Sequence, residues 1–288
     1  CKLSNKLNVN NLKLDVNRWI YFELIKTNEE ARKYIENYRF DEAARIIYQF
    51  VWHSYCDWYI EFLKPIFESK EQIKLTESRY LASFIEANIL VLLHPFIPFF
   101  TEKIWQESQY IKHFKKPLMF KDWRIKKMPA FYKSHSKIDW LIDLVTNIRS
   151  TKVNLNVSPG SFIELSIVEL SQDKKEVIKN NLNVFKRLGR VSNVINKQLN
   201  KNGVKIIVGK ETVILYFDQN LDLNDQKEKI STKMKDLINK INKVGLKLKN
   251  KSFLKKAPKQ IVENEKKALV NYEIELKKLN SILNSIKN

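Results

Sequence analysis

The sequence predicts a mainly α protein, made of a helical bundle, a small α/β module and a C-terminal antiparallel coiled-coil hairpin. Only 5 Gly and 7 Pro occur among 288 residues, so the chain has few of the residues that favour turns. Apolar residues recur at helical spacing in the first half and in heptads at the end, with a short β-type pattern between them. The predicted domains are residues 1–157, 158–219 and 220–288.

The first predicted helix follows Asp15, because Ile20 and Leu24 open a series of apolar residues at spacings of about 3.6. A second helix is expected to begin at Asp41, whose side chain suits an N-cap. It is expected to stop at Pro65, because a proline ring opposes a helix interior.

The rest of the bundle is predicted as three more helices. A third helix runs from Thr76 to the segment HPFIPF at 94–99, where two prolines force a bend. A shorter helix is expected at 101–109. The fifth begins at Ser136, with Asp139 placed as in a capping box.

The pattern changes to β at Ser158. Strands are expected at 162–168, 204–208 and 212–217, with a helical stretch between the first two that ends at Gly189. A module of this length has a thin core, so we expect it to pack on a neighbouring element.

The last segment carries two heptad seams. The first seam is Ile230, Met234, Leu237, Ile241, Val244 and Leu248. The second seam, after Pro258, is Val262, Glu265, Leu269, Tyr272, Leu276, Leu279, Leu283 and Ile286. Because each stripe is too narrow to fold alone and the connection is short, the two helices are predicted to pair as an antiparallel hairpin.

The net charge of +20 comes from 52 Lys and Arg against 32 Asp and Glu. Such a field attracts polyanions, which makes nucleic acid the first candidate partner. The competing explanation is that an AT-rich genome raises Lys and Asn everywhere, and charge alone does not separate the two.

The two cysteines form no disulfide framework or paired metal motif, which favours a reducing compartment, and we expect the cytoplasm. No run approaches the ~18 apolar residues of a membrane span, and no secretory signal pattern is present, so no membrane association is expected. The opening CKLSNKLNVNN lacks an initiator Met, and we interpret the chain as a fragment.

No catalytic constellation is found in the sequence. It contains no Gly-rich phosphate loop, no H-E-x-x-H and no G-x-S-x-G. The four histidines show no metal-ligand spacing, so structural or surface roles are expected for them, and no catalytic or metal-binding residue is predicted.

Aromatic and basic residues alternate between Asn37 and Pro65, a mixture that could stack on unpaired RNA bases. We expect most of the rings to fill the core, because Ala43, Ile47, Phe50 and Trp58 sit on one helical stripe. Buried arginines are rare. The candidates for base contact are therefore Arg39 and Arg45, joined by Arg149 and Lys152 near a helix end.

The hairpin is basic, with 17 Lys against 8 Asp and Glu in residues 221–288. Six of these lysines cluster in its predicted tip and are the candidates for phosphate contact: Lys247, Lys249, Lys251, Lys255, Lys256 and Lys259. The alternative is that they only keep the hairpin soluble.

Several of these segments together resemble the class I valyl-tRNA synthetase family. NYRFDEAARIIYQFVWHSYCDWYIEFLKP at 37–65 and LLHPFIPFFTEKIWQ at 92–106 resemble its anticodon-binding domain, and IRSTKVNLNVSPG at 148–160 resembles the end of that bundle. FLKKAP and IVENEK, inside a coiled-coil hairpin, resemble its C-terminal arm. Residues 162–217 carry the weakest likeness.

The resemblance implies an anticodon-binding helical bundle that recognises valine tRNA and an arm that grips the outer corner of the tRNA. It also implies a monomeric parent ligase that uses ATP, and zinc in its zinc-binding elements. The family's nucleotide-binding signatures and editing insertion are absent from these 288 residues, so we expect no cofactor and no aminoacylation activity in this chain alone. The alternatives are a stand-alone RNA-binding or assembly protein derived from such an enzyme, and a hairpin that serves protein dimerisation.

Overall fold

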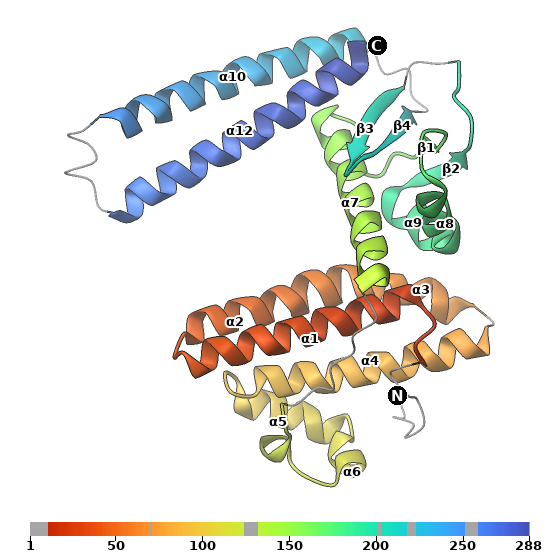
Figure 1. The fold of residues 1–288 in the computed structure, drawn as a ribbon, viewed down its shortest axis with the longest axis vertical. Helices are drawn as coiled ribbons and strands as arrows, with labels where there is room; N and C mark the ends of the chain where they lie inside the picture. Colours follow the sequence, from red (N-terminus) through yellow and green to blue (C-terminus); the bar gives the residue numbers. More distant parts are fainter. Residues whose placement is uncertain are drawn as a thin grey trace. The chain divides into compact units, whose positions relative to one another are not determined.

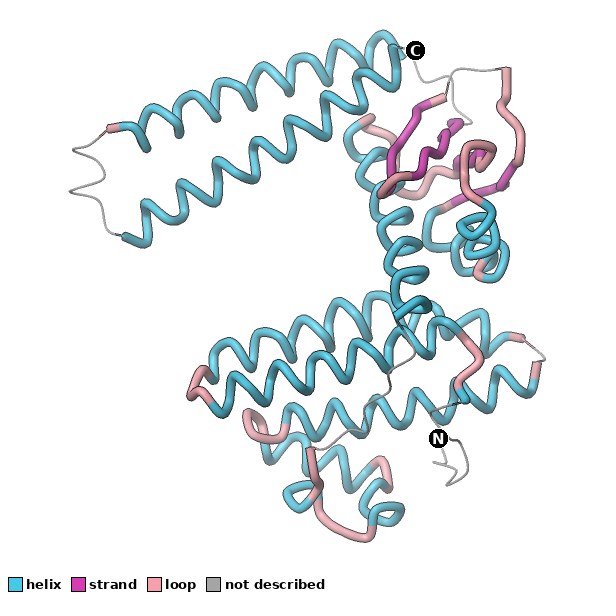
Figure 2. The backbone as a smooth tube through the Cα atoms, viewed as in Figure 1, coloured by secondary structure: helices cyan, strands magenta, loops and turns pink. Residues whose placement is uncertain are grey.

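The computed structural model describes residues 11–69, 71–123, 132–200, 203–217, 223–250 and 259–287. The chain forms two compact units, Cys1–Ile142 and Asp143–Asn288. Helices make up most of both units, and a small sheet lies in the second (Figures 1 and 2), which confirms the mainly α fold class. Helix α7 (Tyr132–Asn154) begins in the first unit and ends in the second.

The first unit is a helical bundle. Its elements before α7 are α1 (Asp15–Glu36), α2 (Phe40–Gln49), a π-helical segment η2 (Phe50–Tyr59), α3 (Ile60–Glu68), α4 (Gln72–Leu93), α5 (Pro98–Glu107), α6 (Tyr110–Phe114) and a 3-10 turn η3 (Leu118–Phe120). Its core contains fully buried side chains of α1, α2 and α4, among them Ile20, Leu24, Ile47, Leu81 and Ile85. A second cluster packs Trp105 and Tyr110 against the end of α4.

A buried polar network joins α1, η2 and α4. The Glu77 carboxylate accepts hydrogen bonds from the backbone N–H of Lys13 at 2.8 Å and of Leu14 at 3.0 Å, and from Asn17 Nδ2 at 2.9 Å. Tyr59 Oη in turn donates to Asn17 Oδ1 at 2.9 Å. Because each of these polar groups is paired, the network fixes the relative positions of three elements of the bundle.

Two predictions for the second helix are wrong. It does not begin with Asp41 as its N-cap, because Arg39 holds that position and Asp41 lies in the first turn. It also does not stop at Pro65, which lies inside α3. The helical path continues through η2 to Glu68, and the packing of buried residues on α3 outweighs the one backbone hydrogen bond that the proline removes.

The π-helical segment also changes which ring is buried. An α-helical stripe through Phe50 leads to Trp58, but Trp58 is only half-buried and Tyr59 is fully buried. A π turn holds more residues than an α turn because its backbone bonds run from i to i+5. The buried face therefore returns nine positions after Phe50, at Tyr59.

Three other predicted helix starts are too late. The third helix begins at Gln72 instead of Thr76, and the fourth at Pro98, which takes the first-turn position that suits proline. The fifth begins at Tyr132 instead of Ser136. Asp139 is no capping-box partner, because its carboxylate accepts hydrogen bonds from Trp19 Nε1 at 2.9 Å and pairs with His135.

The second unit contains a four-stranded sheet with strand order β2-β1-β4-β3. The strands are β1 (Ile163–Ser166), β2 (Val191–Ile195), β3 (Val204–Val208) and β4 (Glu211–Phe217). β1 pairs parallel with β2 and antiparallel with β4, and β3 and β4 form a hairpin. Helices α8 (Gln172–Asn180) and α9 (Leu182–Gly189) connect β1 to β2, a strand that the sequence analysis missed.

The unit ends in the predicted hairpin of two long helices, α10 (Leu223–Lys249) and α12 (Lys259–Lys287). Every first-seam residue is buried or half-buried, whereas its neighbours on α10 are mostly exposed. The second seam is likewise buried or half-buried from Val262 to Leu283, and the side chain of Ile286 lies outside the described residues. The two predicted seams are therefore confirmed over the part that the structure describes.

Candidate nucleic-acid interface

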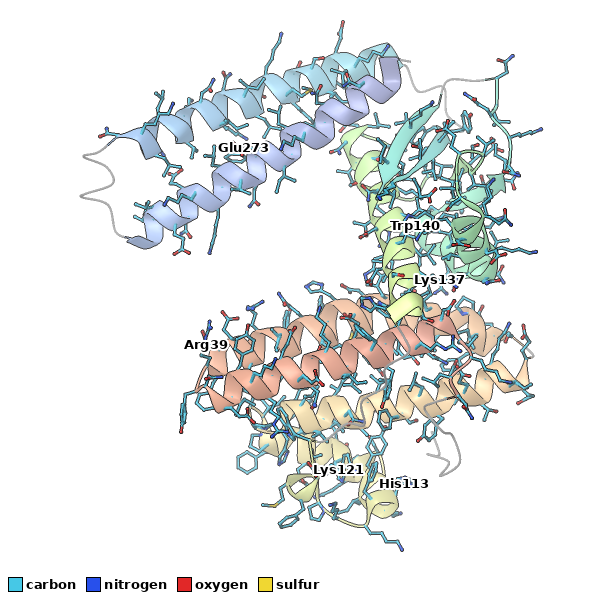
Figure 3. All side chains as sticks on the ribbon, in the orientation of Figure 1. Arg39, His113, Lys121, Lys137, Trp140 and Glu273 are labelled. Carbon is cyan, nitrogen blue, oxygen red and sulfur yellow. The ribbon has the colours of Figure 1, made fainter. Side chains whose placement is uncertain are left out.

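The turn between α1 and α2 presents three consecutive large side chains. Helix α1 ends at Glu36 with Asn37 as its C-cap, and Tyr38 takes a left-handed conformation with φ of 58°, which turns the chain sharply. Tyr38 is 84% exposed and Phe40 is 53% exposed, and their rings meet edge to face with centroids 6.4 Å apart. The Arg39 guanidinium lies over the Tyr34 ring, 5.3 Å from its centroid (labelled in Figure 3).

Glu42 organises the two arginines predicted for this region. Arg39 Nη2 donates to Glu42 Oε1 at 3.3 Å, and Arg45 pairs with the other oxygen of the same carboxylate. Arg45 Nη1 also donates to Gln49 at 3.1 Å. The hydrogen bond to Glu42 raises the pKa of Arg45, so the Arg45 guanidinium stays positively charged at any working pH. Both guanidinium groups are about half exposed and belong to one surface.

The expectation that most rings between Asn37 and Pro65 fill the core is wrong for several of them. Trp52 is 53% exposed and Tyr48 is 58% exposed, and their rings are nearly parallel with centroids 6.2 Å apart. Together with Tyr38 and Phe40 they give α2 and its two ends an aromatic outer face. For Tyr38 a sequence signal existed, because Asn37 favours the end of a helix and so places the next residue in a turn.

A cavity of about 670 Å³ opens at the same end of the bundle. It is lined by Arg32, Ile35, Glu36, Phe40, Pro95, Phe96, Asp122 and Trp123. The α4–α5 bend forms one wall, and His94 Nδ1 and Thr101 Oγ1 lie 2.8 Å apart across that bend. Phe99, 92% exposed, and Phe100, 64% exposed, extend the apolar surface beyond the cavity.

The other two base-contact candidates lie in the second unit. Arg149 Nε and Nη2 both donate to the backbone oxygen of Leu188, at 3.1 and 2.9 Å. Lys152 is only 1% exposed, and its Nζ donates to the oxygens of Ser161 at 2.8 Å and Gly189 at 3.1 Å. We therefore leave Lys152 out of the proposed RNA-contacting set and give it a structural role.

The tip lysines are described only in part. Lys247 Nζ donates to Glu265 Oε1 at 3.0 Å across the hairpin, so the polar residue in the second seam is paired. Lys249 is exposed at the end of α10. Lys251, Lys255 and Lys256 lie outside the described residues, as does the side chain of Lys259.

The histidines hold no metal site in the part of the chain that the structure describes. No group of three His, Cys, Asp or Glu side chains there could hold a metal ion. His135 instead binds two carboxylates, with Nε2 2.5 Å from Glu23 and Nδ1 2.8 Å from Asp139. Burial alone lowers the pKa of His135, but the hydrogen bonds and charges of these carboxylates outweigh it and raise the pKa to about 9.

None of the described helices is long and apolar enough to cross a membrane.

Comparison with known proteins finds two family domains in the chain. Residues 17–168 match the model of the anticodon-binding domain of tRNA ligase, and residues 222–287 match the valyl tRNA synthetase tRNA binding arm. The chain is 39% identical over 255 residues to the valine–tRNA ligase of Pelagibacter ubique, an alignment that covers 88% of this chain and 29% of the relative. It is 33% identical to that of Rhizobium meliloti, over 95% of this chain and 29% of the relative.

The chain thus spans less than a third of the length of these curated relatives. The first family match alone covers more than half of the 288 residues. The chain therefore belongs to the family of tRNA-ligase anticodon-binding domains, and it carries a tRNA-binding arm of the valyl-tRNA synthetase type behind that domain.

Proposed function

We propose that this chain is the tRNA-binding part of a valine–tRNA ligase, with the bundle contacting the anticodon and the hairpin contacting the outer corner of the tRNA. The observation that carries the proposal is the exposed surface at the α1–α2 turn. We name it the turn surface and define it as Tyr38, Arg39, Phe40 and Arg45. It lies within the anticodon-binding match and beside a cavity of about 670 Å³.

The chemistry of the turn surface suits single-stranded RNA. Unpaired bases in a loop are recognised by stacking on aromatic rings and guanidinium planes, and by hydrogen bonds to their edges. Tyr38 and Phe40 supply exposed rings on either side of Arg39 in the chain. Because Glu42 holds Arg39 and Arg45 in one place, their remaining N–H groups are organised before RNA arrives.

The hairpin contributes positive charge rather than a binding surface of specific shape. Its lysines outnumber its acidic residues by 9 over residues 221–288, and the predicted tip holds six of them. Phosphate contacts by lysine position an RNA without reading its sequence. We therefore assign affinity and placement to the arm, and selectivity to the turn surface.

In this proposal the chemical step lies outside these 288 residues. ATP, valine and zinc belong to the remainder of a longer ligase, which acts as a monomer in the cytoplasm. What this chain contributes is the orientation of a bound tRNA, which places its acceptor end for reaction elsewhere.

The test is the affinity of the whole chain for valine tRNA and for a tRNA with a different anticodon. Phe40→Ala removes an exposed ring of the turn surface, and we expect it to weaken valine tRNA binding about tenfold, because base stacking contributes ~1–3 kcal/mol. The effect on the other tRNA is expected to be much smaller. Fluorescence anisotropy at fixed salt measures both dissociation constants.

Phe67→Ala is the matched control, because Phe67 is a 43% exposed ring on α3, outside the turn surface. It is expected to leave both dissociation constants unchanged. If Phe40→Ala and Phe67→Ala behave alike, the turn surface does not read the anticodon. If the unaltered chain binds every RNA equally, a general RNA-binding protein replaces the ligase proposal.

A further inference from the structure

The segment that follows α5 in the first unit is basic, and the proposed function gives it no role. Between Ser108 and Lys137 the sequence holds nine Lys and Arg residues and one acidic residue, Asp122. The structure describes the first part of this segment, through α6 and η3 as far as Trp123. A solvated surface normally mixes charges of both signs, so a surface of one sign is suited to an anionic partner.

The core of the bundle fixes the backbone of this segment. Lys115 takes a left-handed conformation with φ of 56°, which ends α6 and turns the chain. Trp105, which is fully buried, donates from Nε1 to the backbone oxygen of Lys116 at 3.2 Å. The N–H of the buried Leu118 donates to Glu102 Oε2 at 3.0 Å. Because the backbone is held at these two points, the side chains around them project from a fixed frame.

Three lysines of this segment carry positive charge at the surface. They are exposed, and in the part of the chain that the structure describes no carboxylate pairs with them: Lys112, Lys115 and Lys116. Glu107 of α5 pairs with Lys103 at 3.2 Å. Glu102, also of α5, accepts from the Leu118 N–H. The three ammonium groups are therefore open to an anion from solution.

A fourth lysine lies over an aromatic ring. Lys121 Nζ is 3.9 Å from the centroid of the Phe114 ring, which stacks on Trp105 (Lys121 is labelled in Figure 3). A phenyl ring has no net charge, so it orients the ammonium group without neutralising it. Burial, and then the charge of Lys116, lower the pKa of Lys121, and the charge of Asp122 opposes this. Lys116 and Lys121 are therefore close enough to repel each other, a repulsion that a bound anion relieves.

This segment borders the cavity beside the turn surface. Asp122 and Trp123 line that cavity together with Phe40 of the turn surface. Helix α4 separates the two regions, because α1 and α2 pack on one side of it and α5 and η3 on another (Figure 1). A tRNA strand that leaves the turn surface across the cavity therefore reaches the lysines.

We propose that the four lysines bind backbone phosphates of a tRNA strand next to the anticodon loop, while a neighbouring ring stacks on an unpaired base. We call this the α6 site and define it as Lys112, Lys115, Lys116, Phe120 and Lys121. Lysine contacts to phosphate supply affinity without reading sequence. Phe120 is 62% exposed, and an exposed ring among lysines suits unpaired nucleic acid better than an acidic peptide, since bases stack on such rings. This inference rests on the proposed function, because it takes the same tRNA as its ligand.

The decisive variant combines Lys115→Asn and Lys116→Gln in the whole chain. Both substitutions remove a positive charge, and asparagine tolerates the left-handed backbone that residue 115 requires. The hydrogen bond from Trp105 is kept, because it goes to the backbone oxygen of residue 116. The variant therefore removes two charges of the α6 site and leaves its frame in place.

The matched control combines Lys13→Gln and Lys74→Gln. It makes the same charge change on two lysines that are exposed on the first unit. Lys74 lies in the first turn of α4, and the N–H of Lys13 donates to Glu77. Tyr110 of α6 belongs instead to the cluster around Val91, near the other end of α4. The control therefore separates a local contact from a general loss of positive charge.

We expect the α6 double variant to weaken binding of valine tRNA and of a tRNA with a different anticodon alike, about tenfold near 0.1 M salt, and to lower the salt slope by about two. Phe120→Leu should weaken binding about threefold without changing the slope, because it removes a ring and no charge. The control should leave the slope unchanged. Hydroxyl-radical footprinting of the double variant should show lost protection in the strand next to the anticodon loop and retained protection at the outer corner.

Each other outcome contradicts a definite statement. If the unaltered chain binds tRNA and the double variant matches its control, the α6 site is wrong while the proposed function stands. If affinity falls at an unchanged salt slope, the lysines do not contact phosphates. If protection is lost at the outer corner, the site is not next to the anticodon loop. If the unaltered chain does not bind tRNA, both proposals fail together.

Discussion

In the helical bundle of the first unit, helices bury side chains on several faces, whereas α10 and α12 bury one narrow seam each. The bundle also buries a paired polar network around Glu77. In the described part of the hairpin the buried apolar side chains are Ile230, Leu237, Val244 and Leu279.

This difference matches the roles that we assign to the two regions. A densely packed, polar-paired bundle holds its surface groups in place before a ligand arrives, as stereospecific reading of bases requires. Phosphate contacts need little more than charge within reach, so a two-helix arm with a thin seam suffices for them. Three predictions test this contrast.

The largest effect is expected from deleting a buried carboxylate of the bundle. Glu77→Ala removes the acceptor of two backbone N–H groups, which lose their partner, and leaves Asn17 Nδ2 with Ser78 Oγ alone. We expect the free energy of unfolding to fall by about 3–4 kcal/mol, measured by urea denaturation followed by circular dichroism. Glu265→Ala deletes a carboxylate of the arm that pairs with Lys247 near the surface, and should cost less than about 1 kcal/mol. Equal losses would refute the contrast in rigidity.

A pH effect of intermediate size should be confined to the first unit. The folded state holds the pKa of His135 at about 9, above its usual 6.5, because Glu23 and Asp139 stabilise the imidazolium. The stabilisation is fully present below pH ~6.5 and is lost as pH rises through ~9, a change on the order of 2 kcal/mol. His135→Gln should flatten this decline in urea titrations across that range.

Lys152 changes the stability with pH in the opposite direction, so its contribution has to be separated from that of His135. Its folded pKa of about 8 lies below the usual 10.5, so its burial costs least at high pH, and stability rises from about pH 8 upwards. The difference between the unaltered chain and His135→Gln cancels the Lys152 contribution. If that difference stays constant from pH ~6 to ~10, the imidazolium does not stabilise the fold.

The smallest effect is expected from the tip of the arm. Replacing Lys251, Lys255 and Lys256 by Ala should weaken binding of all tRNAs by a similar factor, on the order of tenfold, and lower the salt slope by about two to three. Replacing Lys233, Lys235 and Lys277, which are exposed elsewhere on the arm, makes the same charge change and should have less effect. A selective loss for valine tRNA would contradict the assignment of charge to the arm and reading to the bundle.

The arm was the part most open to prediction, because a heptad pattern depends only on spacing along one helix. Each residue of the first seam, from Ile230 to Leu248, is buried or half-buried as expected. Strand β2 was not predicted because Ser192 and Asn193 at its centre are polar and exposed, so the strand shows no clear alternation of apolar and polar residues. It exists because β1 pairs with it, a tertiary cause that local pattern does not contain.

The candidate site was predicted by residue type but not by role. Arg39 and Arg45 lie together on Glu42, as an exposed pair. Lys152 was chosen on the same grounds and is buried, because the carbonyls at the end of α9 come from a distant part of the sequence. Most rings between Asn37 and Pro65 were expected in the core because of the helical stripe there, but the turn that exposes Tyr38 and Phe40 depends on a left-handed residue.

The π-helical segment has a consequence for how this helix can change length. Phe50 and Tyr59 point into the same core although nine positions separate them, a distance that would put them on opposite sides of an ordinary α-helix. A π segment behaves like an α-helix that has accepted inserted residues without losing its axis. Members of the family that lack a residue or two here could still bury the equivalents of both rings, so this stretch is where gaps in an alignment would be structurally neutral.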